Sequence, residues 1–341
     1  MRKLTGLGSV HKKIFHFILL SVMWGVVLPA PAGAQESATP TVSPPTAETA
    51  CYPLTAILPD GSTLRLEQRP ERICSVVLAA DEILLSLVEP DRIAALSIFA
   101  DDPHYSNVTK HAQEILGRVT SELEQVVRFR PDLVFVADYS RPEFLALLRK
   151  TGLPICRLSN PTSVADTQNN LRLIGRLVGR SRKAEQLIKE MDRRIRAVGV
   201  RIEKANQSRR PGVLFLSYEW TAGEDTLYDE VIRLAGGENA AAREGIVGHK
   251  LVSLEQILKW NPEFVLVEGP LARRGRGEKL VKQYPLLHAL RASREGKIIE
   301  IPPAHAGSVS HHLATGIEEL AALLYPDLSW PQPARPPRGT Q

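Results

Sequence analysis

Aromatic, histidine and arginine side chains gather in short polar segments that directly follow apolar runs of the chain. The segments after the first series of apolar runs carry Phe99, His104, Tyr105, Tyr139 and Arg141. The segments after the second series carry Tyr218, Trp220, His249, Arg273, Arg274 and His305. Flat aromatic faces suit a macrocycle or catecholate rings, and guanidinium groups suit carboxylates or phenolates. The set predicts a binding site for such a ligand.

Two other interpretations apply to the same residues. Each aromatic side chain taken singly is also explained by packing within its loop, and only the set as a whole favours a ligand. Asp101, Asp102 and His104 lie close together and offer oxygen and nitrogen ligands to a metal ion. The Asp-Asp-Pro run is also ordinary turn chemistry. We expect no metal ion held directly by protein side chains.

The apolar runs themselves predict two parallel β-sheets. Short runs at residues 72–79, 92–98, 133–136 and 154–158 predict strands, and a second series follows at 212–217, 264–267 and 297–301. Helical segments such as 81–88 and 227–235 separate them. Continuous apolar strands that alternate with helices indicate sheets with both faces covered. The fold class is therefore α/β, with two lobes that each contain a mainly parallel sheet flanked by helices. Ligands of such sheets bind beyond the carboxyl ends of the strands.

A long amphipathic stretch lies between the two series. Apolar residues recur at helical spacing over residues 169–178 and again from 181 to 206, with charges on the opposite face. Some 25 helical residues extend roughly 37 Å. The sequence thus predicts one long helix that reaches from one lobe to the other.

An internal repeat is the strongest signal in the chain. Residues 123–136 (LEQVVRFRPDLVFV) align without gaps on residues 254–267 (LEQILKWNPEFVLV), at an offset of 131. Each copy is a short helix, a proline that stops it, an acidic residue and a buried strand. Two such units in equivalent places predict two similarly built lobes.

These segments, together with RPERICSVVLAADEILLSL near the start and LAGGENAA before the second copy, resemble the periplasmic binding proteins of the iron-siderophore, haem and cobalamin class. The resemblance covers residues 70–325. It implies two α/β lobes joined by one rigid helix and a metal-chelate ligand (ferric siderophore, haem or cobalamin). It also implies that Glu124 and Glu255 dock on arginines of an ABC importer permease dimer, and that Tyr105 is a possible axial ligand of haem. The alternative is that both glutamates only stabilise helix ends, with Ser121 and Glu124 forming a capping box.

The first 34 residues predict export. Arg2, Lys3, Lys12 and Lys13 precede an apolar run that ends before Ala32-Gly33-Ala34, the order typical of a secretory signal peptide. The run is too short for a membrane anchor, and Cys51 lies too far beyond it for a lipoprotein. Removing the leader takes four of 43 Lys and Arg and none of 38 Asp and Glu, which leaves 39 against 38. Such a balanced charge gives no reason to expect binding to nucleic acid.

The remaining boundaries follow composition. We expect a disordered linker at residues 35–50, an N-terminal lobe at 51–162, a linking helical segment at 163–208, a C-terminal lobe at 209–326 and a Pro-rich tail at 327–341. Cys74 and Cys156 fall in apolar runs and should be buried, and whether either forms a disulfide stays open. We expect His311 and His312 to begin the last helix, with Ser308 or Ser310 as its cap.

Other function classes find little support. No nucleophile elbow, P-loop, zinc-protease motif or dinucleotide-binding glycine motif occurs, although Ser308, His311 and an acid can be combined into a triad on paper. A purely structural exported domain does not explain the duplicated glutamates. We therefore expect a periplasmic, monomeric solute-binding protein with no enzymatic activity and no intrinsic cofactor.

Overall fold

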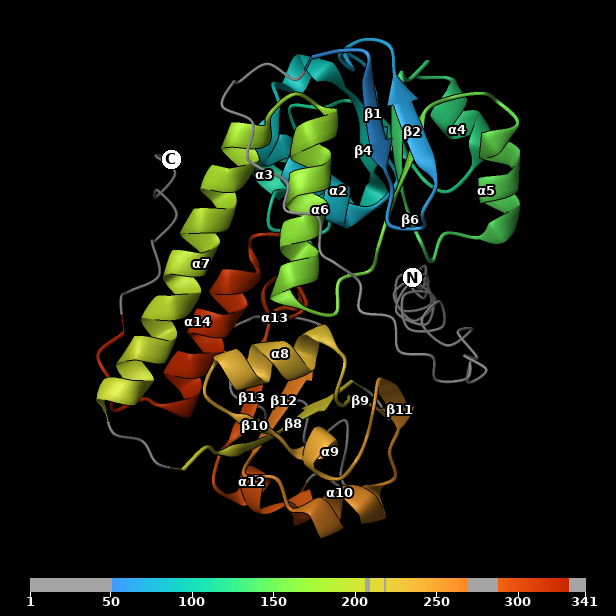
Figure 1. The fold of residues 1–341 in the computed structure, drawn as a ribbon. Helices are drawn as coiled ribbons and strands as arrows, with labels where there is room; N and C mark the ends of the chain where they lie inside the picture. Colours follow the sequence, from blue (N-terminus) through green and yellow to red (C-terminus); the bar gives the residue numbers. More distant parts are fainter. Residues whose placement is uncertain (1–50, 206–208, 218, 269–287, 331–341) are drawn as a thin grey trace, which may run out of the picture.

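The computed structural model describes residues 51–205, 209–217, 219–268 and 288–330, which form two lobes with a long helix along one side (Figure 1). The predicted signal peptide, the linker at 35–50 and most of the Pro-rich tail lie outside the described residues. Within the described part, no helix combines the length and the apolar character needed to cross a membrane.

The N-terminal lobe contains a five-stranded sheet in which every neighbouring pair of strands is parallel. Its order is β5 (Arg118–Val119), β4 (Ile93–Ser97), β3 (Ile73–Ser75), β6 (Leu133–Ala137) and β7 (Ile155–Leu158). The surrounding helices are α2 (Leu78–Leu87), α3 (Thr109–Ala112), α4 (Leu123–Val127) and α5 (Pro142–Arg149). All five residues of β6 are buried, as expected for a strand with both faces covered.

The C-terminal lobe contains a second parallel sheet. Its order is β10 (Glu238–Asn239), β8 (Gly212–Leu216), β12 (Phe264–Glu268) and β13 (Ile298–Ile301). Its helices are α8 (Leu227–Leu234), α9 (Ala240–Arg243), α10 (Leu254–Trp260), α12 (Arg291–Arg294), α13 (Pro303–Ala306) and α14 (Leu313–Leu324). An antiparallel pair, β9 (Trp220–Ala222) with β11 (His249–Leu251), accompanies this sheet. The predicted fold class is confirmed.

The two copies of the repeat adopt the same local structure. α4 leads into β6, which pairs with β3, and α10 leads into β12, which pairs with β8. The residue before each proline, Arg130 or Asn261, has a positive φ of 47° or 45°. A left-handed residue that ends a helix turns the chain sharply into the next element. The repeat therefore directs each strand into its sheet in the same way.

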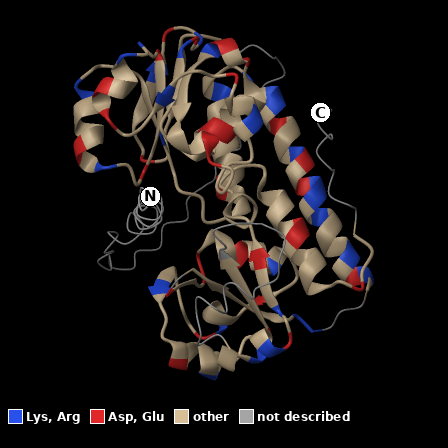
Figure 2. Cartoon of the chain, turned by 180° about the vertical axis from the view of Figure 1, so that it is seen from behind, with Lys and Arg blue, Asp and Glu red and all other residues tan. Residues whose placement is uncertain are grey.

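The linking segment consists of two helices, α6 (Val164–Leu177) and α7 (Ser181–Lys204). Ala184 and Ile188 near the start of α7 belong to the hydrophobic core of the N-terminal lobe, and Val198 belongs to that of the C-terminal lobe. The outer face of α7 carries charges of both signs (Figure 2). One helix of about 36 Å therefore anchors both lobes.

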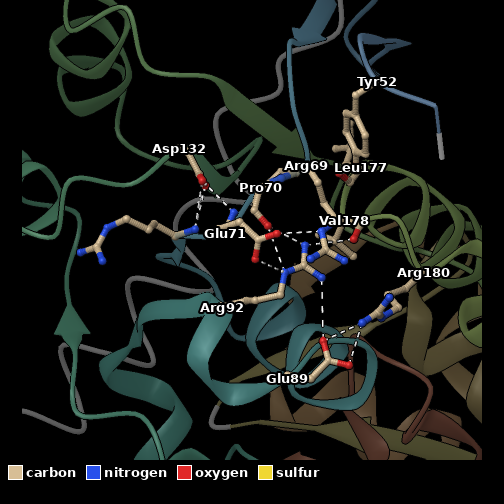
Figure 3. Close-up of polar contacts among 11 residues, drawn as sticks. Tyr52, Arg69, Pro70, Glu71, Glu89, Arg92, Asp132, Leu177, Val178 and Arg180 are labelled. Carbon is tan, nitrogen blue, oxygen red and sulfur yellow. Dashed lines mark hydrogen bonds and ion pairs between the residues drawn. The ribbon is translucent and has the colours of Figure 1, made fainter. Parts of the chain in front are cut away.

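A buried arginine fixes the turn between α6 and α7 to the N-terminal lobe (Figure 3). The guanidinium of Arg92, 4% exposed, donates to the carbonyl oxygens of Pro70 and Val178 and lies 3.2 Å from a carboxylate oxygen of Glu71. Val178 is the C-cap of α6. Nearby, Arg180 donates to both carboxylate oxygens of Glu89 at 2.7 Å. These bonds tie the turn between α6 and α7 to the sheet.

Three local features differ from the expectations. A hairpin of β1 (Leu54–Ile57) and β2 (Thr63–Leu66) precedes the first predicted strand, and α6 begins five residues earlier than expected. The expected cap of the last helix is wrong, because α14 begins at Leu313 with His312 as its N-cap and no side-chain cap. The hydroxyl of Ser310 accepts from the backbone amide of His312 at 3.3 Å and donates to Glu82 of the other lobe.

Candidate functional site

The loops that follow the strands of the two sheets meet at the junction of the lobes. Residues 98–107 follow β4, and α13 follows β13. The backbone amide of Ala304 in α13 donates to the carbonyl oxygen of His104 at 3.1 Å. The carboxyl ends of both sheets, where ligands of parallel sheets bind, therefore face each other across this junction.

Three of the candidate residues lie on the loop of residues 98–107, which we call the cleft loop. Phe99 lies in the 3-10 turn Ile98–Asp101, and His104 and Tyr105 follow it; all three are half-buried. The rings of His104 and Tyr105 contact each other edge to face, with centroids 4.6 Å apart. The loop thus gathers three ring side chains at the edge of the junction.

The two aspartates of the cleft loop serve its structure. Arg118 donates to both carboxylate oxygens of Asp101 at 2.6 Å, which lowers the pKa of Asp101. Asp102 accepts from the backbone amide of His104 at 2.9 Å, as in an Asx turn. No group of three or more metal-ligating side chains occurs in the described residues. The arrangement favours the turn interpretation over a metal site at Asp101, Asp102 and His104.

Tyr139 and Arg141 follow β6 in the N-terminal lobe. Tyr139 is 37% exposed, yet desolvation of its hydroxyl raises its pKa to about 12, with the charges of Asp138 and Asp81 adding to the shift. Its phenol therefore stays protonated at physiological pH. The guanidinium of Arg141 donates to Glu122 at 2.7 Å and to the carbonyl oxygen of Ser121 at 2.9 Å. Arg141 thus joins α5 to the segment before α4.

The C-terminal lobe contributes Trp220, His249 and His305. Trp220 in β9 pairs with Leu251 in β11, and His249 pairs with Ala222. Burial lowers the pKa of His249, and its Nδ1 has no hydrogen-bond partner among the described residues. The Nδ1 atom of His305 lies 2.7 Å from a carboxylate oxygen of Glu319. Tyr218, Arg273 and Arg274 lie outside the described residues.

The repeated glutamates are exposed on two equivalent helices. Glu124 lies in the first turn of α4 and Glu255 in the first turn of α10, and neither makes an ion pair or side-chain hydrogen bond within the described part of the chain. The neighbouring glutamines carry the structural contacts. Gln256 forms a capping box with Ser253, and the side chain of Gln125 accepts from the amide of Thr120 at 2.9 Å.

These contacts correct the expected capping box of Ser121 and Glu124. The N-cap of α4 is Glu122, which makes no side-chain cap bond. Neither glutamate makes a cap hydrogen bond, so a capping box accounts for neither of them, and the helix dipole is the stabilising role that stays open for a carboxylate in a first turn. Each helix also exposes an aliphatic side chain one turn later, Val127 at 37% and Leu258 at 38%.

The triad interpretation of Ser308 and His311 does not match their contacts. The hydroxyl of Ser308 lies 3.3 Å from that of Ser310, and Nε2 of His311 lies 3.3 Å from the hydroxyl of Ser86. A nucleophile and its general base require a direct hydrogen bond or a close approach to one, and the hydrogen bonds found for these two side chains go to other partners.

Sequence reasoning missed one polar group at the junction. Glu82 is 1% exposed and accepts hydrogen bonds from Asn107 and Ser310, which belong to different lobes. Beside it, Asp81 is fully buried and accepts from the amide and the hydroxyl of Ser97. The signal available in the sequence was a pair of adjacent acids inside an otherwise apolar helix, a placement that is rare unless both are hydrogen-bonded.

Comparison with known proteins agrees with this architecture. The family model of the periplasmic binding proteins matches residues 73–305. The substrate-binding lipoprotein YvrC of an ABC transporter from Bacillus subtilis is 23% identical over 288 residues, which cover 82% of this chain and 88% of YvrC. A cobalamin-binding protein from Halobacterium salinarum is 25% identical over 309 residues, 89% of this chain and 82% of its own length.

Solved structures show the same fold. The periplasmic haem-binding protein RhuT from Roseiflexus, in its apo form, superimposes with a TM-score of 0.64 at 25% identity and covers 75% of this chain and 98% of its own. A periplasmic haem-binding protein from Pseudomonas aeruginosa gives a TM-score of 0.66 at 24% identity, and the match covers 77% of this chain and 95% of that protein. The expected resemblance is confirmed, and this chain belongs to the periplasmic binding protein family.

Proposed function

We propose that this chain is an exported, monomeric solute-binding protein that captures an iron chelate, either a ferric siderophore or haem, between its lobes and delivers it to an ABC importer. Family membership supports the carrier role and gives no reason to expect catalysis. The ring side chains of the cleft loop and of β9 and β11 support a ligand with flat faces.

A cobalamin is the second candidate ligand. The cobalamin-binding relative from Halobacterium aligns over 89% of this chain, more than either haem-binding structure covers. A corrin ring presents the same flat apolar faces as a porphyrin, so the cleft residues alone do not separate the two.

The single observation that supports delivery to a membrane partner is the repeated, unpaired glutamate. Glu124 and Glu255 occupy equivalent positions in two lobes, and glutamine performs the structural work at both helices. Carboxylates form directional, bidentate bonds with arginine. Two such carboxylates on similar helices suit a partner with two similar subunits, such as a permease dimer. Val127 and Leu258 offer an apolar contact beside each charge.

Replacing both glutamates by alanine separates transport from ligand binding. In Glu124→Ala/Glu255→Ala we expect uptake into cells to fall by about tenfold or more, because each lost charge-assisted bond contributes about 1.5–3 kcal/mol to the complex. Ligand affinity measured on the purified protein should stay within about twofold, since neither helix lies in the loops after the strands.

The matched control is Glu143→Ala/Glu203→Ala, which removes two exposed carboxylates from α5 and α7. This control carries the same change in net charge and should transport normally. If the control loses as much uptake as the test variant, the effect is one of net charge. If the test variant transports normally, Glu124 and Glu255 have no docking role.

A further inference from the structure

The carboxylate of Glu82 joins the two lobes. Glu82 lies in α2 of the N-terminal lobe. One of its oxygens accepts from the amide of Asn107 at 2.8 Å and from the side-chain nitrogen of Asn107 at 3.0 Å, and the other accepts from the hydroxyl of Ser310 at 2.5 Å. Ser310 lies between α13 and α14 in the C-terminal lobe. One buried side chain thus holds the end of the cleft loop and a segment of the other lobe.

Two further hydrogen bonds cross between the lobes at the same place. The side-chain nitrogen of Asn107 donates to the carbonyl oxygen of Ala304 at 2.6 Å, and the amide of Ala304 donates to the carbonyl oxygen of His104 at 3.1 Å. We call Glu82, Asn107, Ala304 and Ser310 the interlobe cluster. Hydrogen bonds weaken steeply with distance and angle, so a change in the angle between the lobes breaks these bonds.

The residue before Glu82 holds the other end of the cleft loop. Asp81 accepts from the amide of Ser97 at 3.2 Å and from its hydroxyl. Ser97 is the last residue of β4, directly before the cleft loop. Two adjacent buried carboxylates therefore hold the loop at its start and at its end, and the second of them also binds the other lobe.

We propose that Glu82 is a positioning residue that sets the angle between the lobes and, with it, the place of the cleft loop. This inference rests on the proposed ligand site, because the cleft loop carries Phe99, His104 and Tyr105. Glu82 does not touch the ligand; it acts through Asn107 and Ser310.

The energetics favour one lobe angle when the interlobe cluster is intact. A buried carboxylate is stable only when hydrogen bonds replace its lost hydration. Removing the hydroxyl of Ser310 leaves one oxygen of Glu82 without that partner, and water then competes by entering between the lobes. Loss of the Ser310 hydroxyl therefore favours molecules in which the two lobes lie farther apart. The affinity for a ligand that needs the closed arrangement falls by the fraction of molecules that remain closed.

Distances between the lobes of the ligand-free protein test this inference. Spin labels at Glu143→Cys in α5 and Lys259→Cys in α10, in a Cys51→Ser background, report the separation of the lobes by pulsed electron spin resonance. We expect one narrow distance distribution for the parent chain. Ser310→Ala and Glu82→Ala should add a population at longer distance. Glu82→Gln should keep the narrow distribution of the parent chain, because the amide oxygen of glutamine can accept from Asn107 and its amide nitrogen can donate to Ser310.

Two variants control for loss of stability and for misfolding. Arg291→Ala removes the ion pair with Glu295 within α12, which carries no spin label, so it should lower stability slightly without changing the distances. Ser310→Ala removes a single hydroxyl and keeps the test available if Glu82→Ala does not fold. Unchanged distances in Ser310→Ala would overturn the role of Glu82.

Affinity measurements separate this inference from the proposed function. The same variants are titrated with haem, with ferric enterobactin as the siderophore probe and with cyanocobalamin. For whichever probe the parent chain binds, Ser310→Ala should weaken binding by about tenfold if nine-tenths of the molecules open. If the parent chain binds none of the three, the ligand proposal fails, and the distance distributions still decide the role of Glu82.

Discussion

At the scale of single residues, the glutamine and the glutamate of each of the helices α4 and α10 have different roles. Gln125 and Gln256 accept backbone amides at or near the helix starts, whereas Glu124 and Glu255, one residue earlier, make no ion pair or side-chain hydrogen bond within the described residues. A side chain that stabilises its own helix is costly to change, and one that does not is free to bind a partner. The same pair of residue types serves both purposes in both lobes.

The histidines next to the interlobe cluster predict a pH dependence of stability. Burial lowers the pKa of His311 to about 4 and that of His312 to about 3, and nearby cations such as Arg194 add to both shifts. Well above pH 6.5, both histidines are neutral in the folded and the unfolded chain, so they contribute nothing to the pH dependence. As the pH falls from 6.5 towards 4, the unfolded chain binds protons that the folded chain excludes, so stability is lost over this window.

A variant that lacks both histidines isolates their contribution to the pH dependence of stability. The buried acids act in the opposite direction, because burial raises the pKa of Asp81 to about 7 and also raises that of Glu82. We therefore compare the parent chain with His311→Gln/His312→Asn by denaturant unfolding at several pH values. Between pH 7 and pH 5 the variant should gain at least about 2 kcal/mol relative to the parent, at about 1.4 kcal/mol per pKa unit. The exposed His288 supplies the control, His288→Gln. Parallel pH profiles for parent and double variant would contradict the assignment.

At the scale of elements, the linking segment depends on close packing at its turn. A Cβ atom added at Gly175 in α6 would lie 2.5 Å from the Cβ of Ala184 in α7, whereas one added at Gly199 in α7 meets no atom within 4 Å. The two glycines therefore serve different purposes. The first permits α6 and α7 to touch, and the second only weakens its helix.

Alanine at each glycine tests this difference. Gly175→Ala should lower the free energy of unfolding by about 1–3 kcal/mol, because the helices must separate. Gly199→Ala should raise it by about 0.5–1 kcal/mol, because alanine favours the helical backbone. Chemical denaturation of both variants measures the two effects against the parent chain. A neutral Gly175→Ala would show that α6 and α7 do not pack closely at this turn, and a destabilising Gly199→Ala would show that Gly199 does not face open space.

Most elements of this fold are predictable from local patterns, and the exceptions have physical reasons. The strands and α7 follow from apolar runs and helical period. The first turn of α6 lacks an apolar period, and its start depends on Ser163, whose side chain accepts from the amide of Asp166. The β1–β2 hairpin has its signal in Asp60 and Gly61, the latter at a φ of 78°.

The candidate site also contains residues that local sequence patterns predict and contacts that they do not predict. Ring side chains were predicted from their place in loops after buried strands. Phe99, His104, Tyr105 and Tyr139 follow β4 and β6 in this way. The C-terminal residues differ, because Trp220 and His249 lie in the antiparallel strands β9 and β11 and His305 lies in α13. The contact of Glu82 with Ser310 joins residues 228 positions apart. No local pattern encodes such a pairing, because it depends on how two separately folded lobes meet.

At the scale of the whole molecule, two cores share one helix. Residues of α7 belong to both hydrophobic cores, and the interlobe cluster adds hydrogen bonds between the lobes. We expect such a molecule to close only modestly on a ligand, because a long helix resists bending. The proposed metal chelate, which is rigid, suits this expectation.

Titration of the purified protein with haem, a ferric siderophore and cobalamin tests the central claim most directly. We expect a one-to-one complex with at least one of these chelates. Tyr105→Ala and Trp220→Ala should each weaken that complex by about thirtyfold, equivalent to about 2 kcal/mol. Trp330→Ala, which changes a tryptophan that donates to the carbonyl oxygen of Tyr325 away from the junction, should leave affinity unchanged. If the protein binds none of the three chelates, or if neither cleft substitution changes its affinity, the proposal that this chain captures a metal chelate at this site is contradicted.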